Sequence, residues 1–276
     1  MRLTIVQSSI QWEQPDANRL MFAQKLAALR GTTDLVVLPE MFSTGFSMNA
    51  AALAEPMYGP TGRWMRAQAN DLNAVVTGSF ICKEDGRHFN RLVWAYPDGR
   101  LETYDKKHLF GLSGEHEHYT PGRQRLVVEW LGWRICPLIC YDLRFPVWSR
   151  NSSPTPDPSP KGRGDETHLQ GSGGGLFDLL IYVANWPNRR AHHWRSLLTA
   201  RAIENQCFVT GVNIVGKDGN GLEYAGDSAV IDFAGHPICQ ISGQEGVFTA
   251  NLSLPDLKTY RQQLPFLQDA DIFTLH

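Results

Sequence analysis

Cys140 is the residue of this sequence whose position best fits a nucleophile. It directly follows the apolar run at residues 135–139 and precedes a turn, so we expect it at the carboxyl end of a strand. Unpaired backbone N–H groups at such a turn would lower the pKa of the thiol and hold an oxyanion beside the sulfur. The alternative is a buried structural thiol, the commoner role of cysteine. We expect that role for the remaining cysteines, which are Cys82, Cys136, Cys207 and Cys239.

A nucleophilic thiol needs a base and a stabilising positive charge, and two other stretches supply candidates. Glu40 comes just after the apolar strand expected at residues 35–38, and its apolar neighbours suggest partial burial. Strands that end near Glu40 and Cys140 could deliver both side chains to one edge of a sheet. Within residues 104–110 (Tyr-Asp-Lys-Lys-His-Leu-Phe), one of the two lysines could place a fixed charge beside an oxyanion. A solvated carboxylate and an exposed basic pair remain the alternatives.

The nine histidines do not suggest a metal site. Two pairs lie close together in the sequence, His116 with His118 and His192 with His193. Neither pair has a partner set with the spacing of metal ligands, so scattered surface histidines are the simpler interpretation. We therefore predict no metal ion.

Three motifs that carry these candidates follow one another in a fixed order. They are residues 38–42 (Leu-Pro-Glu-Met-Phe), 104–110 and 140–146 (Cys-Tyr-Asp-Leu-Arg-Phe-Pro). Together they resemble the nitrilase superfamily of carbon–nitrogen hydrolases. The resemblance extends to residues 185–187, 201–205 and 226–228, and it covers nearly the whole chain except residues 152–175.

Two stretches resemble one branch of that superfamily in particular. Residues 141–151 and 182–187 are similar to the bacterial omega-amidases. That branch removes the terminal amide of 2-oxo acids such as 2-oxoglutaramate and 2-oxosuccinamate, releasing the 2-oxo acid and ammonia. The resemblance implies a small amide and water as reactants and a cysteine thioester intermediate, with no metal or organic cofactor.

The resemblance also implies a role for each matching residue. Glu40 is expected to be the general base that takes the thiol proton and later activates water. Cys140 is the nucleophile. Lys106, rather than its neighbour Lys107, stabilises the tetrahedral intermediate, and the backbone N–H of Tyr141 helps to hold the oxyanion.

Further residues are expected around this group. Glu115 matches a second acid that orients the lysine, although the glycine-flanked residues 111–114 leave its backbone position open. Arg144 could pair with a substrate carboxylate or form a structural salt bridge. Trp186 could line the substrate pocket or fill the core, and Phe46 is a further candidate for the pocket.

Two other functions stay open at this stage. A different branch of the superfamily would hydrolyse a nitrile, a carbamoyl compound or an N-acyl substrate with the same catalytic residues, because specificity lies in the pocket walls. A protein of another class would be a non-catalytic interaction scaffold that binds a partner through its proline-rich residues 154–160.

Short β-branched runs alternate with helical stretches along the chain, which predicts an α/β layered fold. Strands are expected at residues 3–6, 35–38, 74–81, 92–96, 126–128, 135–139, 179–183, 208–212, 229–231 and 247–250. Helices are expected at about residues 16–29, 61–72, 192–206 and 255–264. The resemblance makes the fold more specific, namely a four-layer α-β-β-α sandwich that usually pairs into a homodimer or a larger assembly.

Residues 152–175 depart from this alternation. They contain 4 Pro, 6 Gly and 4 Ser among 24 positions and only one large aliphatic residue, Leu169. Such a segment cannot bury enough apolar surface to offset its ordering entropy. We therefore predict one domain over residues 1–276 with a disordered insertion at 152–175; a lid over the site is the alternative.

Composition narrows the class of protein. The 26 basic and 28 acidic residues give a net charge of −2 without blocks of like charge, so neither a nucleic acid nor an anionic membrane is the expected partner. No apolar run approaches the roughly 20 residues of a membrane span, and the first residues read as a strand rather than a signal peptide. Five cysteines without a CxxC pair favour thiols in the cytoplasm.

Overall fold

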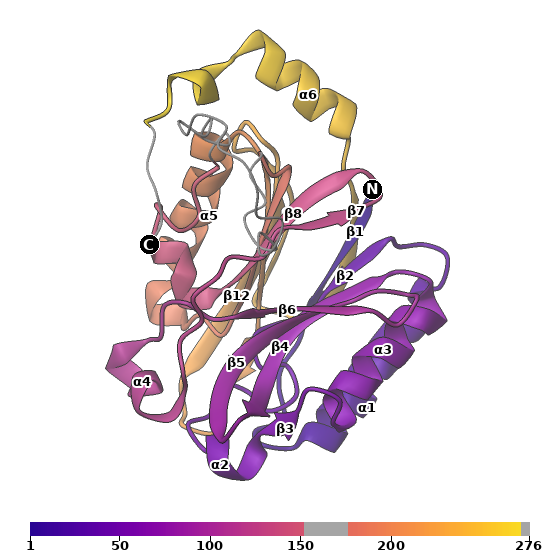
Figure 1. Cartoon of the computed structure of the whole chain (residues 1–276), viewed down its shortest axis with the longest axis vertical. Coiled ribbons are helices and arrows are strands. Elements are labelled where there is room, and N and C mark those ends of the chain that lie inside the picture. Colours follow the sequence, from indigo (N-terminus) through magenta and orange to yellow (C-terminus); the bar gives the residue numbers. More distant parts are fainter. Residues whose placement is uncertain (152–175, 272–276) are drawn as a thin grey trace, which may run out of the picture.

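Two β-sheets pack face to face, with helices on the outer face of each (Figure 1). The computed structural model describes residues 1–151 and 176–271. Helices α1 (Pro15–Leu26) and α3 (Pro60–Leu72) lie side by side against the first sheet, and α5 (Ala191–Asn205) lies against the second. The expected α-β-β-α sandwich is confirmed.

The first sheet has seven strands in the order β14-β1-β2-β4-β5-β6, with β3 paired to β4. Its strands are β1 (Arg2–Gln7), β2 (Leu35–Val37), β3 (Glu55–Pro56), β4 (Val75–Glu84), β5 (Arg87–Ala95), β6 (Leu101–Asp105) and β14 (Gly246–Asn251). Strands β1, β2 and β4 are parallel, and β6 runs in the same direction because it is antiparallel to β5, which is itself antiparallel to β4. The carboxyl ends of β2 and β6 therefore point the same way.

The second sheet also has seven strands, in the order β11-β12-β10-β9-β8-β7, with β13 paired to β12. Its strands are β7 (Val128–Trp130), β8 (Trp133–Ile139), β9 (Leu179–Ala184), β10 (Phe208–Asn213), β11 (Val215–Lys217), β12 (Glu223–Ile231) and β13 (Pro237–Ser242). Strands β8, β9 and β10 are parallel and largely apolar in their centres, as is typical of strands covered on both faces.

Alternation along β2 divides its side chains between two cores. Val36 and the following Leu38 pack with residues of α1 and α3, whereas Leu35 and Val37 belong to the large core between the sheets. Because successive residues of a strand face opposite ways, a strand buried on both faces reads as a continuous apolar run. The chain also forms short helices, which are α2 (Ala50–Leu53), α4 (Glu115–His118) and α6 (Leu254–Gln263).

Several expected boundaries differ from the structure. The strand predicted at residues 126–128 lies two residues later, and β6 and β13 were not predicted because charged and polar residues interrupt their apolar pattern. Trp194 and Leu198 of α5 are buried, whereas Ile203 of the same helix is 53% exposed. Residue 203 lies far enough around the helix to leave the buried stripe.

The predicted insertion at residues 152–175 lies outside the described residues. Its two flanks lie against each other: Asn151 Nδ2 donates to the carbonyl oxygen of Phe177 at 2.9 Å, and Phe177 N–H donates to Asn151 Oδ1 at 2.9 Å. The sandwich is thus closed at this point by contacts between the flanking residues themselves.

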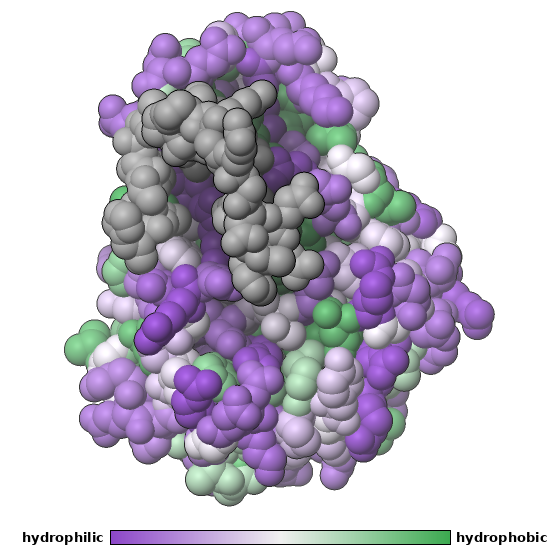
Figure 2. Space-filling view, viewed as in Figure 1, coloured by the Kyte–Doolittle hydropathy of each residue, from purple (hydrophilic) through white to green (hydrophobic). Residues whose placement is uncertain are grey.

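The surface has no single dominant apolar patch on the face drawn in Figure 2. Outside the area covered by grey atoms, hydrophilic residues predominate and the hydrophobic ones are scattered. Among the described residues, no helix is both long enough and apolar enough to cross a membrane.

Gly211 on β10 permits the close packing of α5 on the second sheet. A Cβ atom at this position would lie 2.5 Å from Leu198 Cδ1 and 2.7 Å from Trp194 Cζ2, both of which are fully buried. We expect Gly211→Ala to lower the free energy of unfolding by about 1–3 kcal/mol through overpacking. Gly111→Ala is the control, because its Cβ would meet only His116 Nδ1 at 3.8 Å. Equal urea-denaturation midpoints for the two variants would contradict this account.

Candidate active site

Three of the predicted residues follow the ends of strands, and their side chains lie close together between the two sheets. Glu40 follows β2 of the first sheet, Lys106 directly follows β6 of the same sheet, and Cys140 directly follows β8 of the second sheet. Lys106 Nζ lies 2.9 Å from Glu40 Oε1. Strand ends do bring Glu40 and Cys140 together, but the expectation of one edge of one sheet is wrong, because the two residues follow strands of different sheets. Lys106 lines the same cavity as Cys140.

Lys106 forms an ion pair with two carboxylates at once. Its Nζ also lies 3.0 and 2.9 Å from the two carboxylate oxygens of Glu115, and all three side chains are fully buried. Burial alone would lower the pKa of Lys106, but the charges of Glu115 and Glu40 outweigh it and raise the pKa well above its usual value. The lysine is therefore a fixed positive charge at neutral pH. Lys107, by contrast, lies over the Trp148 ring, 5.3 Å from its centroid.

A glycine turn brings Glu115 into this group. Gly114 has φ = +74°, a conformation that costs glycine little, and the chain then enters α4 at Glu115. Phe110 N–H donates to Glu115 Oε2, which fixes the carboxylate at the turn. Burial is the main cause that raises the pKa of Glu115, followed in order by the opposing charge of Lys106 and the like charge of Glu40. The backbone position that the sequence left open is thus defined by this turn.

Two asparagines that the sequence analysis missed hold Glu40. Asn90 Nδ2 donates to Glu40 Oε1 at 2.8 Å and to Glu115 Oε1 at 3.3 Å, while Ser79 Oγ donates to Asn90 Oδ1. Asn185 N–H donates to Glu40 Oε2 at 2.7 Å. Glu40 is fully buried, so the alternative of a solvated loop carboxylate is wrong. Asn90 lies within β5 between Phe89 and Arg91, where the sequence gave no clear signal of its role.

Cys140 sits at a sharp turn with φ = +43°, where β8 passes into a short 3₁₀ turn. Its Sγ lies 4.0 Å from the carbonyl oxygen of Asn185. Burial and then the Glu40 carboxylate raise the pKa of Cys140 well above its usual value, and Lys106 only partly opposes them. The expectation that backbone N–H groups lower this pKa is wrong. At rest the site holds a thiol, and its proton must be removed before the sulfur can attack.

Asp142 forms hydrogen bonds with both residues 104–108, which carry Lys106, and the end of β8, which precedes Cys140. Its Oδ1 accepts from His108 N–H at 3.0 Å, and its Oδ2 accepts from Tyr104 O–H at 2.7 Å and from Ile139 N–H at 3.1 Å. These contacts fix the segment on either side of Lys106 to the turn that carries Cys140. The spatial link explains why the two motifs occur together, and the sequence alone gave no indication of it.

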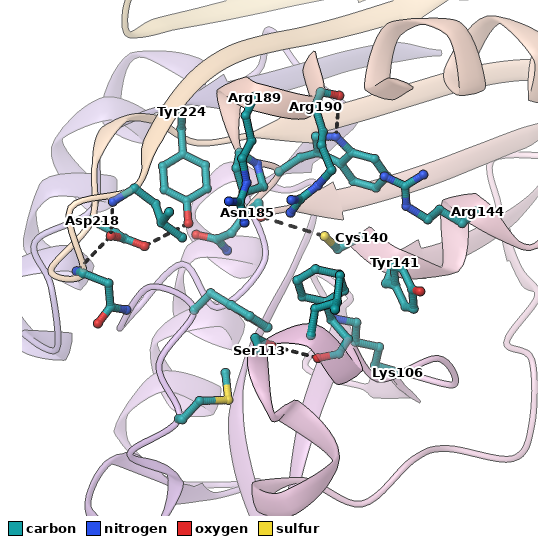
Figure 3. A pocket seen from close by; sticks show the side chains of 18 residues that line it. Lys106, Ser113, Cys140, Tyr141, Arg144, Asn185, Arg189, Arg190, Asp218 and Tyr224 are labelled. Atoms are coloured by element: carbon teal, nitrogen blue, oxygen red, sulfur yellow. Dashed lines mark hydrogen bonds between the residues drawn. The ribbon is translucent and has the colours of Figure 1, made fainter. Parts of the chain in front are cut away.

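A cavity of about 440 Å³ opens over Cys140 (Figure 3). Its lining includes every predicted substrate-binding residue, namely Phe46, Arg144 and Trp186, together with Lys106 and Tyr141. The ring of Phe46 lies 5.0 Å from Lys106 Nζ. Trp186 both packs in the core and lines the cavity, because its ring contacts the ring of Trp194 and its centroid lies 4.7 Å from Arg144 Cζ.

Arg144 is not held by a structural salt bridge within the described part of the chain. Its described polar contact is from Nη2 to His193 Nδ1 at 3.2 Å. Arg189 and Arg190, which we did not predict, lie on the same side of the cavity in Figure 3. Burial lowers the pKa of Arg190, as do the nearby charges of Arg189 and Arg144. The pair of adjacent arginines close after residues 185–187 was the available signal.

The cavity is therefore rich in positive charge. Of its described lining residues, only Asp218 carries a carboxylate, and that group is engaged by Tyr224 O–H at 2.9 Å. Within residues 1–151 and 176–271, no cluster of three or more His, Cys, Asp and Glu side chains is arranged to hold a metal ion. Such a cavity suits a small anion with a group that a thiol can attack.

The chain is similar to known proteins over most of its length. A family model described as carbon-nitrogen hydrolase matches residues 2–154 and 177–262. The chain is 42% identical over 276 residues to the omega-amidase YafV of Escherichia coli (strain K12), covering 100% of this chain and 98% of that protein. It is 32% identical over 239 residues to the 2-oxoglutaramate amidase of Bacillus subtilis (strain 168), covering 86% and 84% of the two chains.

A solved structure agrees with the fold over the full length. A CN-hydrolase superfamily protein of Xanthomonas campestris, which has an arsenic adduct in its active site, superposes with a TM-score of 0.92. The two chains are 49% identical, and the match covers 100% of this chain and 99% of that chain.

The opposing effects of Glu40 and Lys106 on Cys140 give a prediction about thiol reactivity. Glu40→Gln removes the charge that raises the pKa of Cys140 and leaves the charge that lowers it. The thiolate fraction at pH 7 therefore increases, and the rate of alkylation by iodoacetamide should rise several-fold. Peptide mapping identifies the labelled cysteine, and Glu40→Gln with Cys140→Ser is the control. Slower alkylation of Cys140 in the Glu40→Gln variant would contradict the electrostatic assignment.

Proposed function

The chain belongs to the carbon-nitrogen hydrolase family and hydrolyses carbon–nitrogen bonds in linear amides, and from that premise we propose its substrate and mechanism. The proposed substrate is the monoamide of a small 2-oxo dicarboxylic acid, such as 2-oxoglutaramate or 2-oxosuccinamate. The products are the 2-oxo acid and ammonia. The observation that carries this proposal is the thiol of Cys140 at the base of a cavity lined by three arginines.

In the proposed first half-reaction, Glu40 takes the proton from Cys140 and the sulfur attacks the amide carbon. Lys106 and the backbone N–H of Tyr141 stabilise the oxyanion that forms. Glu40 then gives its proton to the amide nitrogen, the carbon–nitrogen bond breaks, and ammonia leaves a thioester on Cys140. The raised pKa of the Cys140 thiol supports the need for a base beside it.

In the second half-reaction, Glu40 takes a proton from a water molecule that attacks the thioester. The proton returns to the sulfur as the acid is released, so no redox step or additional reactant is required. Glu115 is assigned a positioning role, because it contacts Lys106 through both oxygens and is itself fixed by Phe110 N–H. The charge of Lys106 thus stays in place through both halves of the reaction.

Electrostatics favours a 2-oxo acid over the corresponding amino acid. Arg144, Arg189 and Arg190 can pair with the carboxylate of the substrate, and Arg144 has no acidic partner among the described residues. The α-ammonium group of glutamine would enter the same positively charged and partly desolvated space. An unpaired charge there costs several kcal/mol.

We also propose that the chain forms one domain, works in the cytoplasm and assembles as a homodimer. The dimer proposal rests on the family resemblance and on exposed apolar residues of β13 and β14, among them Ile238, Val247 and Phe248 at about 40% exposure. Sedimentation equilibrium measures the mass of the assembly, and a monomer at all concentrations would argue against it.

The role of Cys140 is tested by comparison with Cys136, which lies within β8. Cys140→Ala should abolish ammonia release and leave the melting temperature within a few degrees, since this side chain is only partly buried. Cys136→Ala should retain activity and lower the free energy of unfolding by about 1 kcal/mol, because Cys136 is fully buried in the core. Ammonia release by the Cys140→Ala variant would remove this residue from the mechanism.

The substrate proposal is tested by kcat/KM on one enzyme preparation. We expect 2-oxoglutaramate to exceed glutamine by at least about 100-fold, in line with the cost of an unpaired charge, and an aliphatic nitrile to be barely hydrolysed. Arg144→Gln should lower kcat/KM for 2-oxoglutaramate by about 10- to 100-fold, chiefly through KM, since a charged hydrogen bond contributes about 1.5–3 kcal/mol. Butyramide, which lacks a carboxylate, is the control substrate. Comparable values for glutamine and 2-oxoglutaramate would overturn the proposed substrate class.

A further inference from the structure

Asn185 lies next to Cys140, the proposed nucleophile. It directly follows β9, the neighbour of β8 in the second sheet, and its side chain lines the cavity although only 5% of the residue is exposed. Figure 3 shows Asn185 next to Cys140 at the base of the cavity. The backbone of Asn185 is engaged on both sides, by Glu40 through its N–H and by Cys140 through its carbonyl oxygen.

Hydrogen bonds fix which way the Asn185 side-chain amide points. Its Nδ2 lies 2.7 Å from the carbonyl oxygen of Glu40 and 3.5 Å from Glu40 Oε2. Both of these atoms are acceptors, so the atom facing them must be the donor nitrogen and not the oxygen. The assignment of Asn185 Oδ1 to the opposite side therefore follows from the chemistry of its partners.

Asn185 Oδ1 is buried and has no hydrogen-bond partner within the described residues. Burying a carbonyl oxygen without a donor is costly, and native proteins rarely accept that cost without a reason. The other described buried polar atoms without partners, such as Trp94 Nε1 and Thr210 Oγ1, belong to residues that do not line this cavity. An unpaired acceptor beside Cys140 is suited to a donor that arrives with the substrate.

We propose that Asn185 Oδ1 accepts a hydrogen bond from the amide N–H of the substrate and so favours amides over the corresponding esters. This inference rests on the proposed attack of Cys140 on an amide. An amide directs its oxygen and its nitrogen to different sides of the carbon. With the oxygen at Lys106 and Tyr141 N–H, the nitrogen lies on the side of Glu40 and Asn185.

The proposed hydrogen bond to Asn185 Oδ1 also orients the nitrogen that leaves as ammonia. Glu40 passes the proton taken from Cys140 to the nitrogen, the carbon–nitrogen bond breaks, and ammonia departs. Asn185 transfers no proton. By accepting one N–H of the tetrahedral intermediate, it turns the nitrogen so that its lone pair faces Glu40. An ester places an oxygen without hydrogen at this point, and two acceptors then face each other.

The test compares the amide with the methyl ester of the same acid, 2-oxoglutaramate with the 5-methyl ester of 2-oxoglutarate. In Asn185→Ala, kcat/KM for the amide should fall 10- to 100-fold, and the ratio of amide to ester kcat/KM should fall at least tenfold. Asn90→Ala is the matched control, because it removes one N–H from Glu40 without changing the cavity lining. It should slow both substrates and change the ratio much less.

The inference is overturned if the ratio falls no further in Asn185→Ala than in Asn90→Ala. If the alanine variant does not fold, Asn185→Ser serves instead, because a hydroxyl group can still donate to the carbonyl oxygen of Glu40 but withdraws the acceptor from the cavity. Failure of the proposed substrate has a different signature, since the unaltered enzyme would then hydrolyse another primary amide. The same ratio is then measured with that amide and its methyl ester.

Discussion

A lysine ammonium between two buried carboxylates is the interaction on which this site depends. Lys106, Glu40 and Glu115 are all withdrawn from solvent, and none could be buried alone without a large desolvation penalty. Each carboxylate is also stabilised by hydrogen-bond donors other than Lys106. These donors are Asn90 and the Asn185 backbone N–H for Glu40, and the Phe110 backbone N–H for Glu115. Removal of the lysine charge would leave two buried carboxylates without a cation, so Lys106 is the charge that holds the group together.

The two-sheet sandwich places these charged side chains close together. Two sheets with parallel strands at their centres bring several carboxyl ends to one region, and the polar residues follow directly where the strands stop. Asp142 adds a cross-connection, because it binds backbone and side-chain donors on both sides of Lys106 as well as the last residue of β8. The distance between lysine and cysteine is thereby fixed by hydrogen bonds rather than by side-chain packing alone.

The same charges govern both the resting state and the proposed chemistry. Glu40 raises and Lys106 lowers the pKa of the Cys140 thiol, while burial raises it most of all. The Cys140 side chain is therefore a neutral thiol next to Glu40, its proposed base. The positive charge of Lys106 remains available to stabilise an oxyanion. In the proposed reaction, the arginines on the cavity wall bind the negative charge of the substrate, a task separate from bond cleavage.

Sequence alone determined the layered fold and the positions of the principal residues. Short continuous apolar runs are typical of strands covered on both faces, and the ends of those runs located Glu40 and Cys140. Strands with mixed composition, such as β6, escaped detection because an edge strand need not be apolar on both faces. Spacing along the chain likewise left open which of Lys106 and Lys107 is the buried one, and only the motif resemblance distinguished them.

Only the tertiary structure decided what surrounds each of these residues. The direction of the Cys140 pKa shift, the burial of Glu115, the bonds from Asn90 and Asn185 and the cluster of Arg144 with Arg189 and Arg190 all depend on segments far apart in the sequence. Desolvation and Coulomb energy depend on distance in space and on the exclusion of water. Both energies are therefore set only when the two sheets pack together and exclude water from the site.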